Sequence, residues 1–417
     1  MKISVLKRIT ALILAAGVIL CIPVGCGKKD KEELPVVKLS VWSDERGNEL
    51  LDEIIDDFKA EYASQAQFDI TVSNESEMTC KETVLENPQA AADIYTFADD
   101  QLEELWRAGA LLEITDEAAD IIAENGGEDS GVCRSAMREG KLVAYPETAG
   151  NGYFLYYNSS YFTDEDVKSF DKILEIAAAS GKKVAMDFSS GWYIYSFFKG
   201  AGLELECNDD GVTNHCNWNA TDTDITGEQV AQAMLAVAQH DGFINCTDSL
   251  FLSGIEDGSI IAGVNGAWNA SYVEDAFGDN YAAVKLPEYT VGGRQVQMCS
   301  FAGYKLVGVN AYTKNPQWAM RLARRITNEQ NQLRRFEVTG ECPSNINAAK
   351  SEEIQSSPAV SALAEQSAYG YTQSVADTFW DPASIFGITI AGGNADNRPL
   401  QTLLDDMVDG ITSKGVG

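Results

Sequence analysis

Strand-like segments alternate with helix-like segments along most of this 417-residue chain. Residues 37–42 alternate between apolar and polar side chains, as strands do, and residues 49–63 follow with the apolar stripe of a helix. Two further strand-like segments, 68–72 and 92–97, come next. Strands that alternate with helices in this way form mostly parallel sheets, because each helix carries the chain back to the start of the next strand. The pattern therefore predicts an α/β fold.

A polar, glycine-containing break divides this pattern into two stretches. Residues 141–146 and 153–158 read as strands, and residues 147–152 lie between them. Further helices are expected at 99–108, 164–180, 191–202, 227–240, 248–258, 316–327 and 328–338, and further strands at 183–188, 260–265, 281–287 and 303–309. We interpret the break as a hinge between two α/β lobes, a division that suits the length of the chain.

The N-terminal segment reads as an export signal. Basic residues precede an apolar run over 9–24, which is short for a membrane span of about 20 residues, and Cys26 follows it. The end of the run is similar to a bacterial lipobox, whose cysteine is lipidated. We therefore expect that residues 1–25 are removed, that Cys26 carries a lipid, and that 26–37 tether the protein to the extracellular face of the bacterial cell membrane.

Acidic residues strongly outnumber basic ones. The chain has 63 Asp and Glu against 31 Lys and Arg, and its formal net charge is −32. A surface of this charge repels phosphate backbones and anionic lipid headgroups. The charge therefore excludes a nucleic-acid-binding protein, although it does not identify a ligand.

Catalytic and metal-binding motifs are missing from the sequence. The two histidines, His215 and His240, belong to no HExxH sequence, and the chain has no GxSxG or P-loop sequence. Residues 222–228 resemble the start of a calcium loop, but Ala233 stands where the loop needs its glutamate. We interpret them instead as a loop that leads to a helix capped by Thr226. We predict no enzyme, no metal ion and no organic cofactor.

Seven cysteines follow Cys26, and none forms a CxxC pair. An odd number of scattered cysteines is not a disulfide framework, and without neighbouring histidines it is not a zinc site. Cys207 and Cys216 flank a turn-rich segment that a hairpin would fold back on itself. A disulfide between these two cysteines stays open at this point.

Several short motifs are similar to those of a known family. They are Lys38-Leu-Ser-Val-Trp42 with Glu45-Arg46-Gly47, Ala91-Ala-Asp-Ile94 continuing to Asp100, Gly109-Ala-Leu-Leu-Glu-Ile-Thr115, Gly140-Lys-Leu-Val-Ala-Tyr-Pro146, Leu155-Tyr-Tyr-Asn158, Asn265-Gly-Ala-Trp268 and Thr378-Phe-Trp380. By their order and spacing, the chain resembles the extracellular solute-binding proteins of carbohydrate ABC importers. Among these it is most similar to the maltose/maltodextrin-binding proteins.

The resemblance implies a two-lobed, type II periplasmic-binding-protein-like fold with a hinge and a ligand cleft between the lobes. The N-terminal lobe is expected to consist of residues 38–150 and about 302–328, and the C-terminal lobe of 151–301 and about 329–417. The resemblance also implies a lipid-anchored, monomeric receptor. Such a receptor binds malto-oligosaccharides and delivers them to the transmembrane subunits of an ABC permease.

The family's binding residues carry over to matching positions of this sequence. Clefts of this kind stack pyranose rings on aromatic side chains and bind hydroxyl groups with charged and amide side chains. By motif position, the ligand-binding residues are expected to be Glu45, Arg46, Phe97, Asp100, Asn151, Trp192, Trp268 and Trp380. Phe97 stands where the family's maltose binders often carry tryptophan, and Gln101 where they often carry arginine. Asn151 stands at a glutamate position, for which Glu147 and Gly150 are the alternatives.

Two other functions stay open. The departures at Phe97, Gln101 and Asn151 leave room for a different oligosaccharide in the same fold, such as a xylo- or galacto-oligosaccharide. A secreted carbohydrate-active enzyme with unrecognised carboxylates is the other alternative, which the release of reducing sugar would identify.

Overall fold

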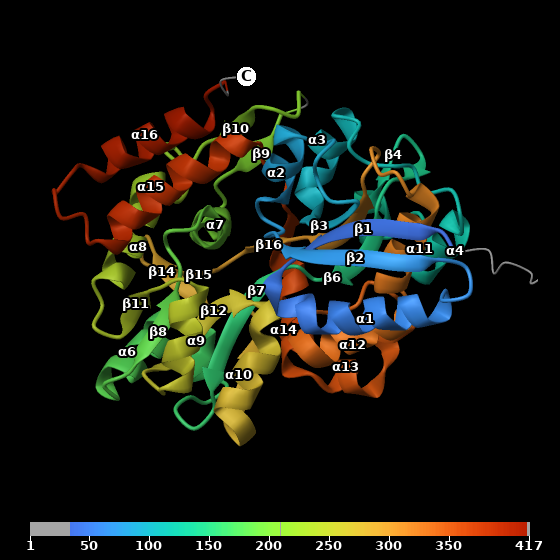
Figure 1. The fold of residues 1–417 in the computed structure, drawn as a ribbon. Coiled ribbons are helices and arrows are strands. Elements are labelled where there is room, and N and C mark those ends of the chain that lie inside the picture. The colour runs from blue at the N-terminus through green and yellow to red at the C-terminus, as the bar shows by residue number, and fades with distance from the viewer. Residues whose placement is uncertain (1–33, 209, 415–417) are drawn as a thin grey trace, which may run out of the picture.

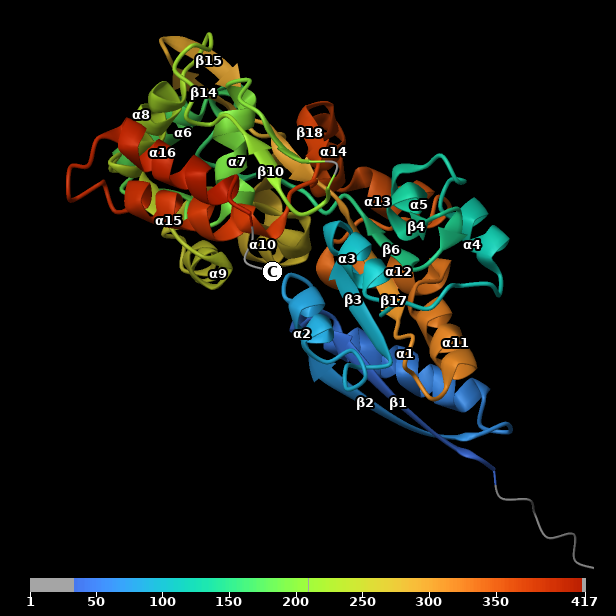
Figure 2. The same cartoon turned by 90° about the horizontal axis from the view of Figure 1, so that it is seen from above.

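Two five-stranded sheets form the centres of two lobes (Figure 1 and Figure 2). The computed structural model describes residues 34–208 and 210–414. The expected signal peptide, the lipidation site Cys26 and most of the expected tether lie outside these residues. Among the described residues, every helix falls short of the length or the apolar character that crossing a bilayer requires.

The first lobe has the strand order β2-β1-β3-β17-β6. Its strands are β1 (Val36–Ser43), β2 (Gln67–Asn74), β3 (Ile94–Ala98), β6 (Tyr145–Ala149) and β17 (Tyr304–Val309), and the short ribbon β4 (Met137–Arg138) and β5 (Lys141–Leu142) lies beside them. β1 is parallel to β2 and β3, whereas β17 is antiparallel to both its neighbours, β3 and β6. The helices are α1 (Asn48–Glu61), α2 (Cys80–Glu86), α3 (Leu102–Arg107), α4 (Ala118–Glu124), α5 (Gly131–Ala136) and α11 (Pro316–Ile326). The apolar stripe of α1, which includes Ile54 and Phe58, enters the core of this lobe.

The second lobe has the strand order β11-β8-β12-β7-β13. Its strands are β7 (Tyr153–Asn158), β8 (Lys183–Met186), β11 (Phe243–Asn245), β12 (Ile260–Gly266) and β13 (Tyr281–Val284). The helices are α6 (Phe170–Ala179), α7 (Gly191–Gly200), α8 (Gly227–Ala238), α9 (Asp248–Glu256), α10 (Ala270–Phe277), α14 (Pro358–Gln366), α15 (Trp380–Ala391) and α16 (Leu400–Ile411). Three ribbons complete the lobe: β9 (Leu205–Cys207) with β10 (Asn214–Cys216), β14 (Glu288–Val291) with β15 (Arg294–Gln297), and β16 (Ser300–Ala302) with β18 (Gly370–Thr372).

Most of the predicted elements are confirmed. The strand expected at 153–158 coincides with β7, and Thr226 caps α8 in a capping box with Gln229. The helix expected at 99–108 begins instead with a 3-10 turn over Asp99–Gln101, which precedes α3. The sheets are less uniformly parallel than the alternation predicted, because strands such as β17 enter from distant parts of the chain and run against their neighbours.

The segments that cross between the lobes lie side by side. The backbone N–H of Asn151 donates to Gly303 O at 2.9 Å, and that of Ala149 donates to Cys342 O at 2.8 Å. The chain is predicted to return to the second lobe near residue 329, where helix α12 (Glu329–Thr339) begins. This helix packs against α1 of the first lobe as well as α10 of the second, and the N–H of Ile346 donates to Glu124 O at 2.9 Å. Residues 329–346 therefore contact the first lobe.

Helix α12 ends where the lobes touch. Gly340 has a left-handed φ of 77°. A Cβ atom at this position would lie 2.6 Å from the Cβ of Ala270, which begins α10. Glycine is therefore needed both for the conformation and for the close approach of the two helices.

The turn-rich segment between Cys207 and Cys216 forms the predicted hairpin, but the cysteines do not face each other. The register pairs Cys207 with Asn214 and Cys216 with Leu205. The cysteines of the described residues all carry free thiols. The hairpin is thus held by its backbone hydrogen bonds and packing, not by a disulfide.

Candidate functional site

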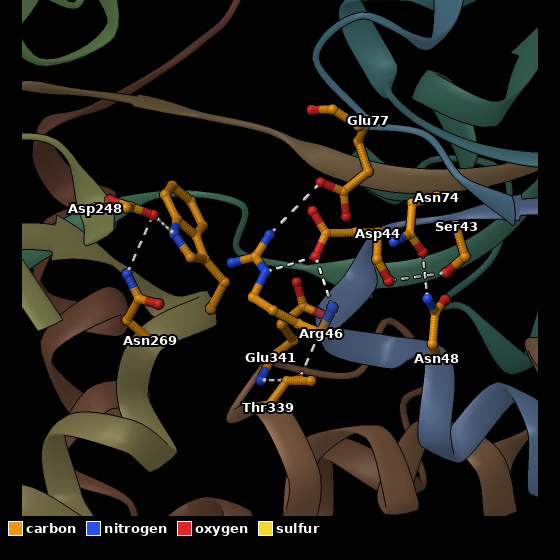
Figure 3. A network of polar contacts seen from close by, with 12 residues as sticks. Ser43, Asp44, Arg46, Asn48, Asn74, Glu77, Asp248, Asn269, Thr339 and Glu341 are labelled. Carbon is orange, nitrogen blue, oxygen red and sulfur yellow. Dashed lines mark hydrogen bonds and ion pairs between the residues drawn. The ribbon is translucent and has the colours of Figure 1, made fainter.

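Arg46 extends from the first lobe toward the second (Figure 3). It lies in a 3-10 turn directly after β1, where the carboxylate of Asp44 caps the turn by accepting from the backbone N–H of Arg46 at 3.0 Å. The same carboxylate oxygen accepts from Arg46 Nε at 2.7 Å, and Glu77 lies 3.8 Å from Arg46 Nη2. The guanidinium carbon is 6.0 Å from the centre of the Trp268 ring. The turn after β1 thus presents a charged group to the other lobe.

Trp268 is the second lobe's counterpart of this group. It lies in the turn after β12, and its indole Nε1 donates to Asp248 Oδ2 at 2.9 Å. Asp248, the first residue of α9, also accepts from the side chains of Asn265 at 3.0 Å and Asn269 at 3.3 Å. These bonds fix the edge of the indole and leave its face toward Arg46.

Trp192 and Trp380 both lie near one buried aromatic ring, that of Phe301. Trp192 belongs to the first turn of α7 and Trp380 begins α15. The Phe301 ring centre is 5.3 Å from that of Trp192 and 6.5 Å from that of Trp380. Both tryptophans are half-buried. Within the described residues, the buried Nε1 of Trp192 has no hydrogen-bond partner. The second lobe therefore supplies all three of the predicted tryptophans.

Asp100 contacts the second lobe, whereas its neighbour Asp99 supports the first. Asp99 is buried and accepts from Ser135 Oγ at 2.8 Å and from the N–H of Tyr304 at 3.0 Å. Asp100 Oδ2 accepts from Gln373 Nε2, and Oδ1 is buried without a hydrogen-bond partner among the described residues. Burial, and next the charge of Asp99, raise the pKa of Asp100 to about 7. Asp100 is thus a hydrogen-bonding group whose charge changes near neutral pH.

The other predicted residues, Phe97, Glu45 and Asn151, lie in the first lobe and at the crossing between the lobes. The ring of Phe97 is fully buried in the core of the first lobe beside Tyr95, because β3 turns it away from the surface. Glu45 is exposed, and the acidic partner of Arg46 is Asp44 instead. Asn151 lies at the crossing between the lobes, where its backbone contacts Gly303.

Two further positions singled out by the family resemblance, Gln101 and Glu147, make contacts that support the structure. Gln101 Nε2 donates to Glu77 O at 2.6 Å and to Met78 O at 3.2 Å, and so fixes the loop before α2. Glu147 is 1% exposed, and its carboxylate lies 2.6 Å from Arg335 Nη2.

A buried charge network beneath Arg46 was not predicted from the sequence. Lys305 Nζ donates to Glu77 Oε1 at 2.7 Å and to the carboxylate of Glu341, and lies 6.0 Å from the centre of the Trp268 ring. Although burial alone acts to raise it, the pKa of Glu341 is lowered to about 2 by Lys305 and then Arg335. The sequence feature that could have indicated this network is a lysine, Lys305, inside the otherwise apolar strand β17.

Comparisons with known proteins agree with this architecture. The sequence pattern of the bacterial extracellular solute-binding proteins matches residues 53–362. A galactooligosaccharide-binding protein of Bacillus subtilis (strain 168) is 26% identical over 422 aligned residues, which cover 95% of each chain. The maltodextrin-binding protein MdxE of the same organism is 24% identical over 288 residues, 66% of each chain.

A solved structure with acarbose is 27% identical, with a TM-score of 0.78 over 90% of this chain and 98% of the other. This likeness confirms the predicted two-lobed, type II fold. Because the family pattern extends over more than half of its length, the chain belongs to the bacterial extracellular solute-binding proteins.

Proposed function

We propose that this protein binds a neutral oligosaccharide between its lobes and delivers it to the transmembrane subunits of an ABC importer. The observation that carries the proposal is the pairing of Trp268, anchored by Asp248, with Arg46 of the opposite lobe. An aromatic face covers the C–H face of a pyranose ring, and charged groups bind its hydroxyls. A neutral ligand suits this cleft because Arg46 is already paired with Asp44.

Malto-oligosaccharides are the first candidate ligand. The relatives solved with acarbose and named for maltodextrin support this choice. A galacto-oligosaccharide is the second candidate, because the relative named for that sugar aligns over nearly the whole chain. The buried position of Phe97 also favours a departure from the maltose binders, since it removes one ring from the cleft.

Entry of the ligand requires a rearrangement at Arg46. The cavity bounded by Arg46, Glu77, Trp268 and Glu341 has a volume of about 10 Å³. This is smaller than the roughly 300 Å³ of the smallest typical pockets for organic ligands. The lobes therefore open, or Arg46 moves aside, before a sugar ring stacks on Trp268. The bound sugar then selects the closed form through the contacts made only there.

The proposal also includes the anchor and the location. Cys26 carries the lipid, and residues 26–37 hold the monomeric body at the extracellular face of the bacterial cell membrane. A Cys26→Ser variant is expected to be released into the medium, whereas the parent protein stays with the membrane and gains the mass of two acyl chains. Release of both forms would contradict the anchor.

Calorimetry of the mature protein tests the ligand. The panel contains maltotriose, longer maltodextrins, a galacto-oligosaccharide, xylotriose and raffinose, and reducing sugar is assayed in parallel. Binding of α-glucans without hydrolysis supports the first candidate, and binding of the galacto-oligosaccharide alone supports the second. Binding of none of these sugars would overturn the oligosaccharide proposal, and release of reducing sugar would make the protein an enzyme.

A further inference from the structure

Away from Trp268, two polar side chains of the first lobe reach one short segment of the second. Lys81 Nζ lies 2.5 Å from Asp377 Oδ1. Gln373 Nε2 donates to Asp100 Oδ2. Lys81 belongs to α2 and Asp100 to the turn after β3, whereas Gln373 and Asp377 lie between β18 and α15. These contacts therefore join the lobes at a second place.

The segment 373–377 is fixed to the second lobe through its backbone. The N–H of Cys207 donates to Ser374 O at 2.9 Å. The side chain of Asn214 donates to Ala376 O at 3.1 Å and accepts from the N–H of the same residue at 2.7 Å. A movement of the second lobe therefore carries this segment with it.

Lys81 and Asp100 are fixed to the first lobe in a similar way. The side chain of Lys81 is only 6% exposed and lies 3.0 Å from Glu104 Oε1. The backbone N–H of Lys81 donates to Gln101 Oε1 at 3.0 Å, and Gln101 is the residue after Asp100. Both ends of each contact are thus held in place on their own lobe, and the contacts separate when the lobes move apart.

A third contact lies at the same side of the molecule. The β9–β10 hairpin approaches α3 of the first lobe (Figure 1), and a Cβ atom on Gly211 would lie 3.1 Å from Arg107 Nη1. Gly211 has a left-handed φ of 72°. The guanidinium of Arg107 thus lies close to the backbone of the hairpin, so the lobes approach each other at a third point on this side.

We propose that the Lys81–Asp377 ion pair and the Gln373–Asp100 hydrogen bond form a latch that closes together with the ligand cleft. The proposal rests on the function proposed above. Gln373 is a positioning residue, because it holds Oδ2 of Asp100 while the buried Oδ1, unpartnered among the described residues, can accept from a ligand hydroxyl group. Because Lys81 and Asp377 are charged, the latch makes the affinity for a neutral ligand depend on salt.

The test compares Asp377→Asn with Asp381→Asn. Asp381 is an exposed carboxylate at the start of α15, four positions further along, so its variant makes the same change of charge. Calorimetry with maltotriose, or with the galacto-oligosaccharide if that sugar alone binds, gives Kd at ionic strengths of about 0.01 M and about 1 M. Between these the Debye length falls from about 30 Å to about 3 Å. X-ray scattering of the ligand-free proteins gives the radius of gyration.

The expected result has three parts. The parent protein and Asp381→Asn lose about 5-fold in affinity as salt is raised. Asp377→Asn binds about 5-fold more weakly at low salt and responds little to salt, and its radius of gyration without ligand is larger. A Kd and a salt response of Asp377→Asn equal to those of the parent would overturn the latch.

The scattering measurement separates failure of the latch from failure of the proposed function. If no sugar binds, the function proposed above fails, and the comparison of ligand-free radii still decides the latch. Equal radii of Asp377→Asn and the parent would then overturn it. Gln373→Leu adds a second readout, since a positioning role predicts weaker sugar binding with unchanged melting temperature, and unchanged binding would contradict that role.

Discussion

The carboxylate of Asp248 accepts a hydrogen bond from the indole of Trp268 at 2.9 Å, so the first turn of α9 fixes the aromatic ring that the turn after β12 presents. Asp248 also accepts from Asn265 and Asn269. The ring is therefore held along its edge, and its orientation does not depend on the first lobe. Asp248 thus positions the indole that we propose as the stacking face for the sugar.

Replacement of Trp268 by alanine is expected to weaken sugar binding by about 2 kcal/mol, or about 30-fold in Kd, because the stacking face is lost. Calorimetry measures this change. Trp106→Ala on α3 of the first lobe is the control for loss of a tryptophan elsewhere. Full affinity in Trp268→Ala would show that the sugar does not stack there.

Replacement of Asp248 by alanine is expected to cost less than loss of the ring itself. It removes one hydrogen bond that orients the indole, which is worth about 1 kcal/mol, and leaves the face in place. The variant should therefore bind with roughly 5-fold weaker affinity. Asp275→Ala, an exposed residue on α10, should bind like the parent. An effect of Asp248→Ala as large as that of Trp268→Ala would mean that Asp248 itself contacts the sugar.

Lys305→Met is expected to destabilise the protein strongly. Lys305 is 4% exposed and pairs with Glu77 and Glu341. Its removal leaves these carboxylates with more distant cations only, Arg46 at 3.8 Å from Glu77 and Arg335 at 3.8 Å from Glu341. Breaking one side of a buried ion pair costs about 3–5 kcal/mol. Urea denaturation measures the loss. Lys59→Met breaks an exposed pair with Asp56 and should cost less than about 1 kcal/mol. A similar small effect at Lys305 would contradict the role of the network.

The Asp100→Asn variant is expected to be more stable than the parent, and by a larger margin at higher pH. Burial, with the charge of Asp99 added, raises the pKa of Asp100 to about 7, although Lys81 opposes the shift. The unfolded chain therefore loses this proton first, and the free energy of unfolding falls as pH rises from about 4 to about 7. Because asparagine does not titrate, the variant does not lose this part of its free energy of unfolding as pH rises. Its gain in melting temperature over the parent should be greater at about pH 8 than at about pH 5, and an equal gain would contradict the assignment.

Cys207 is expected to be the thiol that reacts first with a disulfide reagent in the folded protein. It is partly exposed, whereas Cys216 across the hairpin is buried and burial raises its pKa to about 12. The fast phase should disappear in Cys207→Ser and persist in Cys216→Ser. Appearance of the fast phase only after prior reduction would instead indicate a Cys207–Cys216 bond.

Local patterns predicted the elements well, because a strand such as β7 or a capped helix such as α8 is determined by neighbouring residues. The cleft was predicted less completely. Its tryptophans have recognisable motif positions, but the partner of Lys305 is 228 positions away at Glu77, and no local pattern encodes such a distance. At Phe97 the motif position and the local strand pattern disagree. A motif position identified it as a binding residue, whereas the alternation along β3 buries its ring.

Strand β17 determines when the first lobe can finish folding. It comes from residues 304–309, yet it provides the hydrogen-bonding partner of both β3 and β6. As the chain leaves a ribosome or an export channel from its N-terminus, the first sheet stays divided until all the strands of the second sheet have emerged. The first lobe therefore cannot become a finished unit early in synthesis, as N-terminal domains commonly do. A chain that folds late stays unfolded for longer, and passage through a narrow membrane pore requires an unfolded chain.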